Sequence, residues 1–242
     1  MKNTSIMQHS SRNRSAPFKR VSVIVAIVAV AACAAFFSGA VMCKDQPAAA
    51  IKSVHSKITI VYADSSLKSK SAEAWIVLPN KYRAETVDSL RIRNGRNEWI
   101  LNKRNNRYHV NHRPSDPPIQ VQRWSTPDSS VDAWRHVRPD LTKTNIKKQL
   151  DGVERDAVEV VLPDVKGGSQ KVDLFPETNT GRIATKITYQ LDDQGKLVWT
   201  ERVDYEYNRD IDEKLFKFVS PAGAVLVQDM ADLKWAPDAY LK

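Results

Sequence analysis

Apolar and polar residues alternate strictly near the end of the chain, over residues 197–207. One set of alternate positions is apolar or aromatic apart from a single acid: Leu197, Trp199, Glu201, Val203, Tyr205 and Tyr207. The set between them is mostly charged: Val198, Thr200, Arg202, Asp204 and Glu206. A period of two is the signature of a β-strand with one side in water. The chain therefore builds a sheet, and the question is what its apolar side faces.

Further strand-like runs fill the chain from residue 58 to residue 228. Asn94-Gly95 and Asp151-Gly152 lie between such runs and predict tight hairpins, because these turns need positive φ. One helix is expected from Ser129 or Ser130 to about Arg138, with an apolar stripe of Val131, Trp134 and Val137. Short turns favour antiparallel neighbours, and long antiparallel sheets curl. We expect a mainly β (α+β) fold with a curved antiparallel sheet of about 10–11 strands.

The N-terminal region reads as an export signal or a membrane anchor. Residues 1–20 form a basic leader without acids, and residues 21–43 form an uncharged apolar run long enough to cross a hydrocarbon core of about 30 Å. Three fates stay open: cleavage before Val41, lipidation at Cys33, and retention as an inner-membrane anchor. In each case residues 44–52 are a linker, and the chain beyond it is extracytoplasmic.

The remaining residues, 53–242, are enough for one domain with a sizeable core. Five of the 37 basic residues and none of the 28 acidic ones lie in the leader, so the rest carries 32 minus 28, or +4. This mild charge argues against a nucleic-acid binder. Both cysteines lie in the N-terminal region, which excludes a disulfide or a thiolate metal site in the domain. We expect a monomer.

No residue pattern in the domain predicts catalysis. A nucleophile elbow, a phosphate-binding loop and a metalloprotease helix are all missing from the sequence. His109 and His112 are three residues apart, which on a strand points them to opposite faces and makes a poor chelate. The sequence therefore predicts neither an enzyme nor a cofactor or metal site.

Aromatic residues on the expected strands leave two interpretations open. They either fill an ordinary core, or they line a concave apolar surface that is left partly empty. In the second case a lipid would gain roughly 25 cal/mol for each Å² of apolar area that it buries.

Four short blocks, in this order, resemble motifs of the LolA-like outer-membrane lipoprotein carrier and sorting superfamily (LolA/LolB/RseB-like). Residues 74–85 resemble its strand followed by Pro-x-x-aromatic-Arg-x-Glu, and residues 93–99 resemble its Gly-x-x-x-Trp hairpin. Residues 151–153 and 173–185 resemble its later hairpin and D-x-x-T-G turn, and residues 212–224 resemble its closing block. The resemblance spans about residues 53 to 228.

The resemblance implies an incomplete barrel closed by a helical lid, with a cavity for the acyl chains of a lipid or lipoprotein. It implies a lid-contacting role for Arg83. The expected cavity residues are Trp75, Val77, Trp99, Ile187, Tyr189, Trp199, Val203 and Tyr205. The carriers of this superfamily begin with an amphipathic helix, which residues 48–54 are too short to form. A tethered or accessory lipid-binding protein, or an envelope sensor or regulatory binding protein, therefore fits better than a shuttle.

Overall fold

The computed structural model describes residues 50–163 and 168–235. Its strands are β1 (Ser53–Tyr62), β2 (Lys70–Val77), β3 (Lys81–Thr86), β4 (Ser89–Asn94), β5 (Asn97–Asn102), β6 (Arg107–His112), β7 (Thr142–Leu150), β8 (Val153–Pro163), β9 (Ser169–Pro176), β10 (Ile183–Leu191), β11 (Leu197–Tyr207) and β12 (Val225–Val227). Its helices are α2 (Pro127–Arg135) and the short 3-10 turns η1 (Val121–Trp124), η2 (Glu213–Phe216) and η3 (Met230–Leu233). The expected leader and apolar segment lie outside the described residues. Within these ranges, no helix has the length and apolar character needed to span a membrane.

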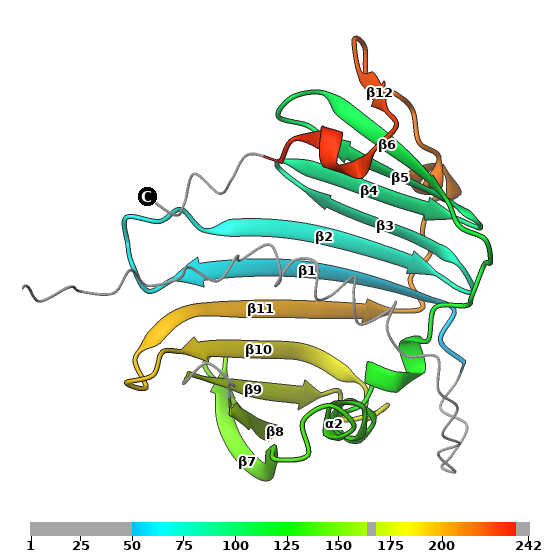
Figure 1. The fold of residues 1–242 in the computed structure, drawn as a ribbon. Helices are drawn as coiled ribbons and strands as arrows, with labels where there is room; N and C mark the ends of the chain where they lie inside the picture. The colour runs from blue at the N-terminus through cyan, green and yellow to red at the C-terminus, as the bar shows by residue number, and fades with distance from the viewer. Residues whose placement is uncertain (1–49, 164–167, 236–242) are drawn as a thin grey trace, which may run out of the picture.

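The strands form a single open, curved sheet (Figure 1). Their order is β12-β6-β5-β4-β3-β2-β1-β11-β10-β9-β8-β7, so β12 and β7 are the edges of the described sheet. Every pair is antiparallel except β12 with β6, which is parallel. The parallel pair arises because residues 208–224 cross the sheet before β12 begins, instead of turning back beside it. The expected fold class, an incomplete barrel with a helical lid, is confirmed, with 12 strands in place of 10–11.

Both expected hairpins are present. Asp151 and Gly152 have φ values of 52° and 80°, the two positive angles that this tight turn needs. In the hairpin between β4 and β5, Asn94 pairs with Asn97, so the loop consists of Gly95 and Arg96. Gly95 has a φ of 62°, and the first loop position is therefore the one that favours glycine here.

The helix begins slightly earlier than expected. Thr126 is its N-cap: the Thr126 side chain accepts a hydrogen bond from the Ser129 amide, and the Ser129 side chain accepts one from the Thr126 amide. Pro127 follows at the first helical position, where its missing amide hydrogen costs nothing. This reciprocal capping fixes the start of α2 at the end of the proline-rich loop.

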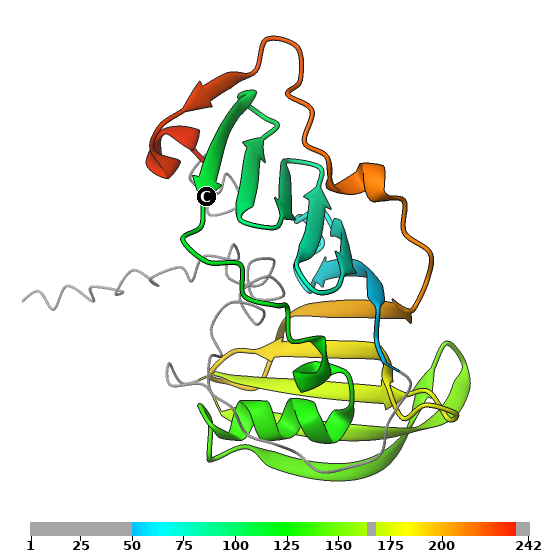
Figure 2. The same ribbon diagram turned by 90° about the vertical axis from the view of Figure 1, so that its right-hand side faces the viewer.

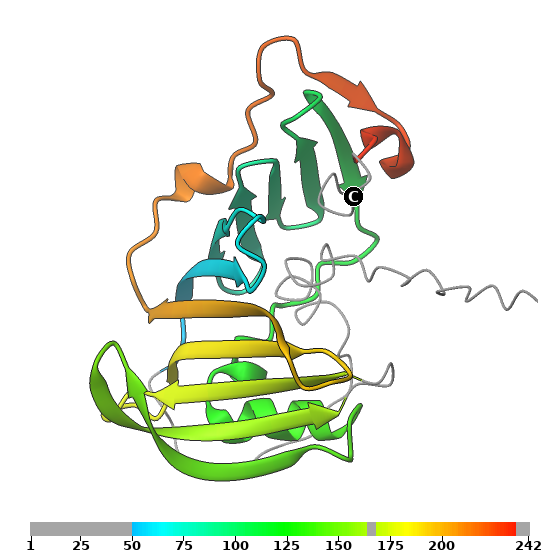
Figure 3. The same ribbon diagram turned by 90° about the vertical axis from the view of Figure 1, so that its left-hand side faces the viewer.

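The two faces of the sheet have different covers. The face turned toward α2, called the helix face below, carries Ile58 and Ile60 of β1, which pair with Val203 and Glu201 of β11. Residues 113–126 run along the helix face, and residues 208–224 run along the opposite face (Figures 2 and 3). Cross-strand partners share a face, so this assignment extends from strand to strand across the sheet. In β11 the two buried residues, Glu201 and Val203, both lie on the helix face, and the residues between the alternate positions are half-buried or exposed.

Three apolar clusters occupy the helix face, and Tyr205 packs against all of them. The first joins Val54 and Ile76 to Ile119 and Val121 of the loop. The second lies under α2 and contains Val131, Leu141, Val160, Val172, Leu174 and Ile183. The third contains Ile58, Ile60, Ala72 and Val203. The Tyr205 ring also lies 5.7 Å from the Trp124 ring, centroid to centroid, which ties the loop to the middle of the sheet.

Candidate functional site

The eight expected cavity residues divide between the two faces. Trp199, Val203 and Tyr205 lie on the helix face, in line with Ile58 and Ile60. The other five lie on the opposite face: Trp75, Val77, Trp99, Ile187 and Tyr189. The register of the strands explains this, because each of these five residues is paired across the sheet with a residue whose side chain points away from α2. The eight residues therefore do not line a single surface.

Three of the five residues on the opposite face, Trp75, Trp99 and Ile187, contact other side chains of the protein. The Trp75 ring stacks on the His55 ring at 5.3 Å between centroids. The Trp99 ring stacks on the Phe218 ring at 6.0 Å. Ile187 packs against Leu150, Ala157 and Phe175 beneath the β7–β8 hairpin.

Tyr189 belongs to a polar cluster on the same opposite face. The ammonium of Lys148 lies 4.9 Å from the centre of the Tyr189 ring and also pairs with the fully buried carboxylate of Asp173. Burial raises the pKa of Tyr189 to about 12, and the neighbouring Asp173 carboxylate adds to the rise. Tyr189 is thus a neutral phenol held within an ion-pair network.

Arg83 contacts a helical turn, although not α2. Its Nη1 donates a hydrogen bond to the carbonyl oxygen of Leu215 at 3.0 Å, in η2. The same guanidinium pairs with Glu85 and lies 5.7 Å from the centre of the Trp75 ring. Arg83 therefore holds the segment of residues 208–224 against the face opposite α2.

A pocket lies between the C-terminal end of α2 and the helix face. It has a volume of about 270 Å³ and is lined by Trp134, Val137, Arg138, Leu162 and Gln170. The buried residue Val131, one turn earlier in the helix, packs on Val160 and Leu174 and holds α2 against the sheet. Strands β8 and β9 bring Leu162 and Gln170 together as a registered pair. The pocket is therefore built from α2, the turn that follows it, and strands β8 and β9.

The sequence carried only part of the signal for this pocket. Trp134 and Val137 belong to the apolar stripe expected for the helix, although they were not assigned to a site. Leu162 and Gln170 come from separate strands, and only the register places them opposite α2. Arg138 has no local pattern that marks it.

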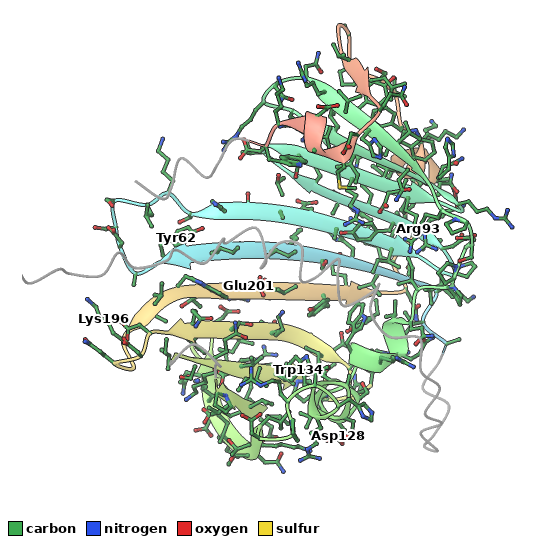
Figure 4. All side chains as sticks on the ribbon, in the orientation of Figure 1. Tyr62, Arg93, Asp128, Trp134, Lys196 and Glu201 are labelled. Carbon is green, nitrogen blue, oxygen red and sulfur yellow. The ribbon has the colours of Figure 1, made fainter. Side chains whose placement is uncertain are left out.

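Charged side chains also reach the helix face. Glu201 and Lys186 form an ion pair at 3.0 Å, and the Glu201 side chain is only 5% exposed. Figure 4 shows Glu201 midway along β11, Trp134 on α2 and Arg93 on β4. Burying a charge is costly unless it is paired, and this pair meets that condition. The helix face is thus apolar with ionic groups at defined positions.

The described ranges offer no metal centre. Among these residues, no group of three or more His, Cys, Asp or Glu is placed to hold an ion. His109 Nδ1 lies 3.2 Å from the carbonyl oxygen of Val227, whereas His112 Nδ1 lies 2.8 Å from Asn97 Oδ1. The two rings make separate contacts and do not converge on one point.

No family model matches this chain, and no curated protein matches it. Among solved structures, it is similar to MucB, with 14% identity and a TM-score of 0.37 over 72% of this chain and 60% of that one. It is also similar to the MucA/MucB complex of Pseudomonas aeruginosa, with 14% identity and a TM-score of 0.35 over 69% of this chain and 56% of that one. A third is a LolA superfamily protein from Nitrosomonas europaea, with 13% identity and a TM-score of 0.24 over 69% of this chain and 89% of that one. This chain spans less than two thirds of the MucB chains that it matches. The superfamily that the sequence resembles is represented among the matched structures.

Proposed function

We propose that this protein is an extracytoplasmic, non-enzymatic binding protein that holds an acyl chain of a lipid or lipoprotein between α2 and the helix face. The observation that supports this most is the pocket of about 270 Å³ lined by Trp134, Val137 and Leu162. Its size is close to the lower end of small-molecule sites, about 300 Å³, so it suits one chain or part of one. The chain would gain roughly 25 cal/mol for each Å² of apolar area that it buries there, before the cost of ordering it.

Filling the pocket tests the proposal. Val137 lines the pocket and is 59% exposed, so a larger side chain can be placed there without overpacking the core. We expect Val137→Trp to weaken binding of a fluorescent fatty acid by about tenfold, because the indole occupies the space of the chain. Titration of delipidated protein followed by fluorescence measures the dissociation constant.

Val153→Trp is the matched control for this substitution. Val153 is 54% exposed and lies at the start of β8, by the β7–β8 turn rather than at the pocket. We expect its affinity to equal that of the unmodified protein. Equal affinity of all three proteins, or no binding by any of them, would count against the proposal.

The cellular form follows from the fate of residues 1–43, which lie outside the described residues. We propose that the domain acts on the outer side of the inner membrane, as a monomer, and that residues 21–43 deliver or anchor it there. The intact mass of the mature protein distinguishes the forms. Loss of the first 40 residues fits a soluble carrier, retention fits a tethered sensor or accessory protein, and a diacylglyceryl adduct on Cys33 fits a lipoprotein acceptor.

A further inference from the structure

The pocket at the end of α2 combines apolar walls with one positive charge. Trp134, Val137 and Leu162 supply hydrocarbon and aromatic surface, and Gln170 supplies an amide. Arg138 is the one charged residue among the five described residues that line the pocket. A pocket with this composition suits an amphiphile whose head group is negative.

Arg138 has donors to offer at this position. Its Nε lies 3.4 Å from Asp140 Oδ1, and the Asp140 side chain is 54% exposed. The Arg138 side chain is half-buried, but its pair with the exposed Asp140 is long and contributes little, so a ligand anion can compete with Asp140 for the guanidinium. The planar guanidinium can give two parallel hydrogen bonds to a carboxylate or a phosphate, which makes it a selective partner for both groups.

The backbone at the end of α2 does not oppose an anion there as strongly as an open helix end would. The carbonyl oxygen of Trp134 accepts hydrogen bonds from the amides of Val137, at 3.0 Å, and Arg138, at 2.8 Å. These bonds satisfy one of the terminal carbonyls that carry the negative end of the helix dipole. The Gln170 amide nitrogen is held by Gln190 Oε1 at 2.9 Å, which fixes the polar wall.

We infer that the pocket selects anionic single-chain amphiphiles, with the chain against Trp134, Val137 and Leu162 and the carboxylate or phosphate on Arg138. This inference rests on the proposed function, because it names the head group of the bound lipid. Its test compares ligands of one chain length: hexadecanoate, hexadecyl phosphate and neutral hexadecanol. Each is titrated by calorimetry into delipidated full-length protein, and inorganic phosphate alone serves as the ligand without a chain.

We expect at least one of the two acids to bind about tenfold more tightly than hexadecanol, which is the effect of one charge-assisted hydrogen bond. Arg138→Gln should remove this preference and leave the affinity for hexadecanol unchanged. Arg138→Lys, which keeps the charge, should retain part of the preference. The acid that loses affinity in Arg138→Gln identifies the head group as carboxylate or phosphate.

Arg135→Gln is the matched control. Arg135 is the last residue of α2, three positions before Arg138; its side chain is 53% exposed, and it pairs with Asp132 at 3.6 Å. Arg135→Gln should leave the affinities for hexadecanoate, hexadecyl phosphate and hexadecanol unchanged. If unmodified protein binds hexadecanol as tightly as both acids, or if Arg138→Gln keeps the preference, the inference is overturned and the proposed function stands. If no ligand with a chain binds, the proposed function fails and this inference fails with it.

Discussion

The buried guanidinium of Arg93 connects the proline-rich loop to β4. Its Nη2 donates to Asp116 Oδ1 at 2.8 Å and to the carbonyl oxygen of Pro117 at 2.6 Å, and its side chain is 8% exposed. The same loop inserts Ile119 and Val121, both buried, against the helix face. Arg93 therefore helps to hold the segment that leads to α2, beside the hydrogen bond that the Ile119 amide donates to the Pro79 carbonyl oxygen at 2.7 Å.

We expect Arg93→Met to lower the free energy of unfolding by about 3 kcal/mol, because it removes the charged partner of the Asp116 carboxylate, which then keeps only the hydrogen bond from the Asn80 amide. Urea unfolding followed by tryptophan fluorescence measures the change. Arg96→Met, at an exposed position in the adjacent hairpin loop, should change stability by less than about 0.5 kcal/mol. Equal stability of the two variants would show that Arg93 does not hold the loop.

At the scale of an element, the β7–β8 hairpin folds over the face of the sheet opposite α2. Asp151 at its tip accepts two hydrogen bonds from Arg202 of β11, at 2.6 and 2.8 Å. Leu150 at the end of β7 packs with Phe175, which is 2% exposed. The hairpin is thus held by an ion pair at its tip and an apolar contact below it.

Acid should loosen this hairpin. The Arg202 guanidinium lowers the pKa of Asp151 below its ordinary value. Because the folded carboxyl holds its proton less tightly than the unfolded one, the pair contributes fully above about pH 4 and is lost as the pH falls through the lower, folded-state pKa. The hydrogen-exchange protection factors of the amides in residues 147–156 should therefore decrease when the pH is lowered below about 4.

Asp151→Asn should show the same low protection already at neutral pH, with no further acid step. Asp156→Asn is its control, since Asp156 pairs with Lys147 in the same hairpin at 2.9 Å and both side chains are well exposed. That variant should behave as the unmodified protein does. Full protection in Asp151→Asn at neutral pH would contradict this account of the hairpin.

At the scale of the whole molecule, the segment 208–224 joins the two halves of the sheet. It leaves β11, crosses the face opposite α2 and reaches β12 at the far edge (Figure 2). Phe216 is fully buried, and the Phe218 ring lies 5.1 Å from the Tyr108 ring. The segment covers Trp99 of β5 and Tyr108 of β6, which would otherwise face water.

We expect Phe216→Ala to destabilise the protein by about 3 to 5 kcal/mol through the cavity that it leaves. Limited proteolysis should then cut within residues 208–224, and thermal melting should measure the loss. Val219→Ala, at a position that is 80% exposed in the same segment, should leave both measurements unchanged. Resistance of Phe216→Ala to protease would show that other contacts hold the segment.

Local patterns predicted much of this architecture, and long-range register decided the rest. The alternation in β11 and the Asp151-Gly152 turn are local, so the sequence predicts them well. Which face a strand's apolar set occupies depends on its neighbour: Trp75 pairs with His55, away from α2. Trp99 was assigned to the cavity because the sequence does not show that Phe218, more than a hundred positions later in the chain, stacks on its ring. The pocket was missed for the same reason.

The pairing of β1 with β11 sets an order on assembly. Val54 is opposite Tyr207, so two neighbouring strands near the middle of the sheet come from nearly opposite ends of the described chain. Hairpins such as β4–β5 and β9–β10 close over short loops and can form early. The pairing of β1 with β11 forms later, because it closes a loop of about 150 residues. During synthesis almost the whole domain must therefore leave the ribosome before β1 and β11 can pair. Until then, each of these two strands has an edge whose backbone groups are unpaired and could bind another chain.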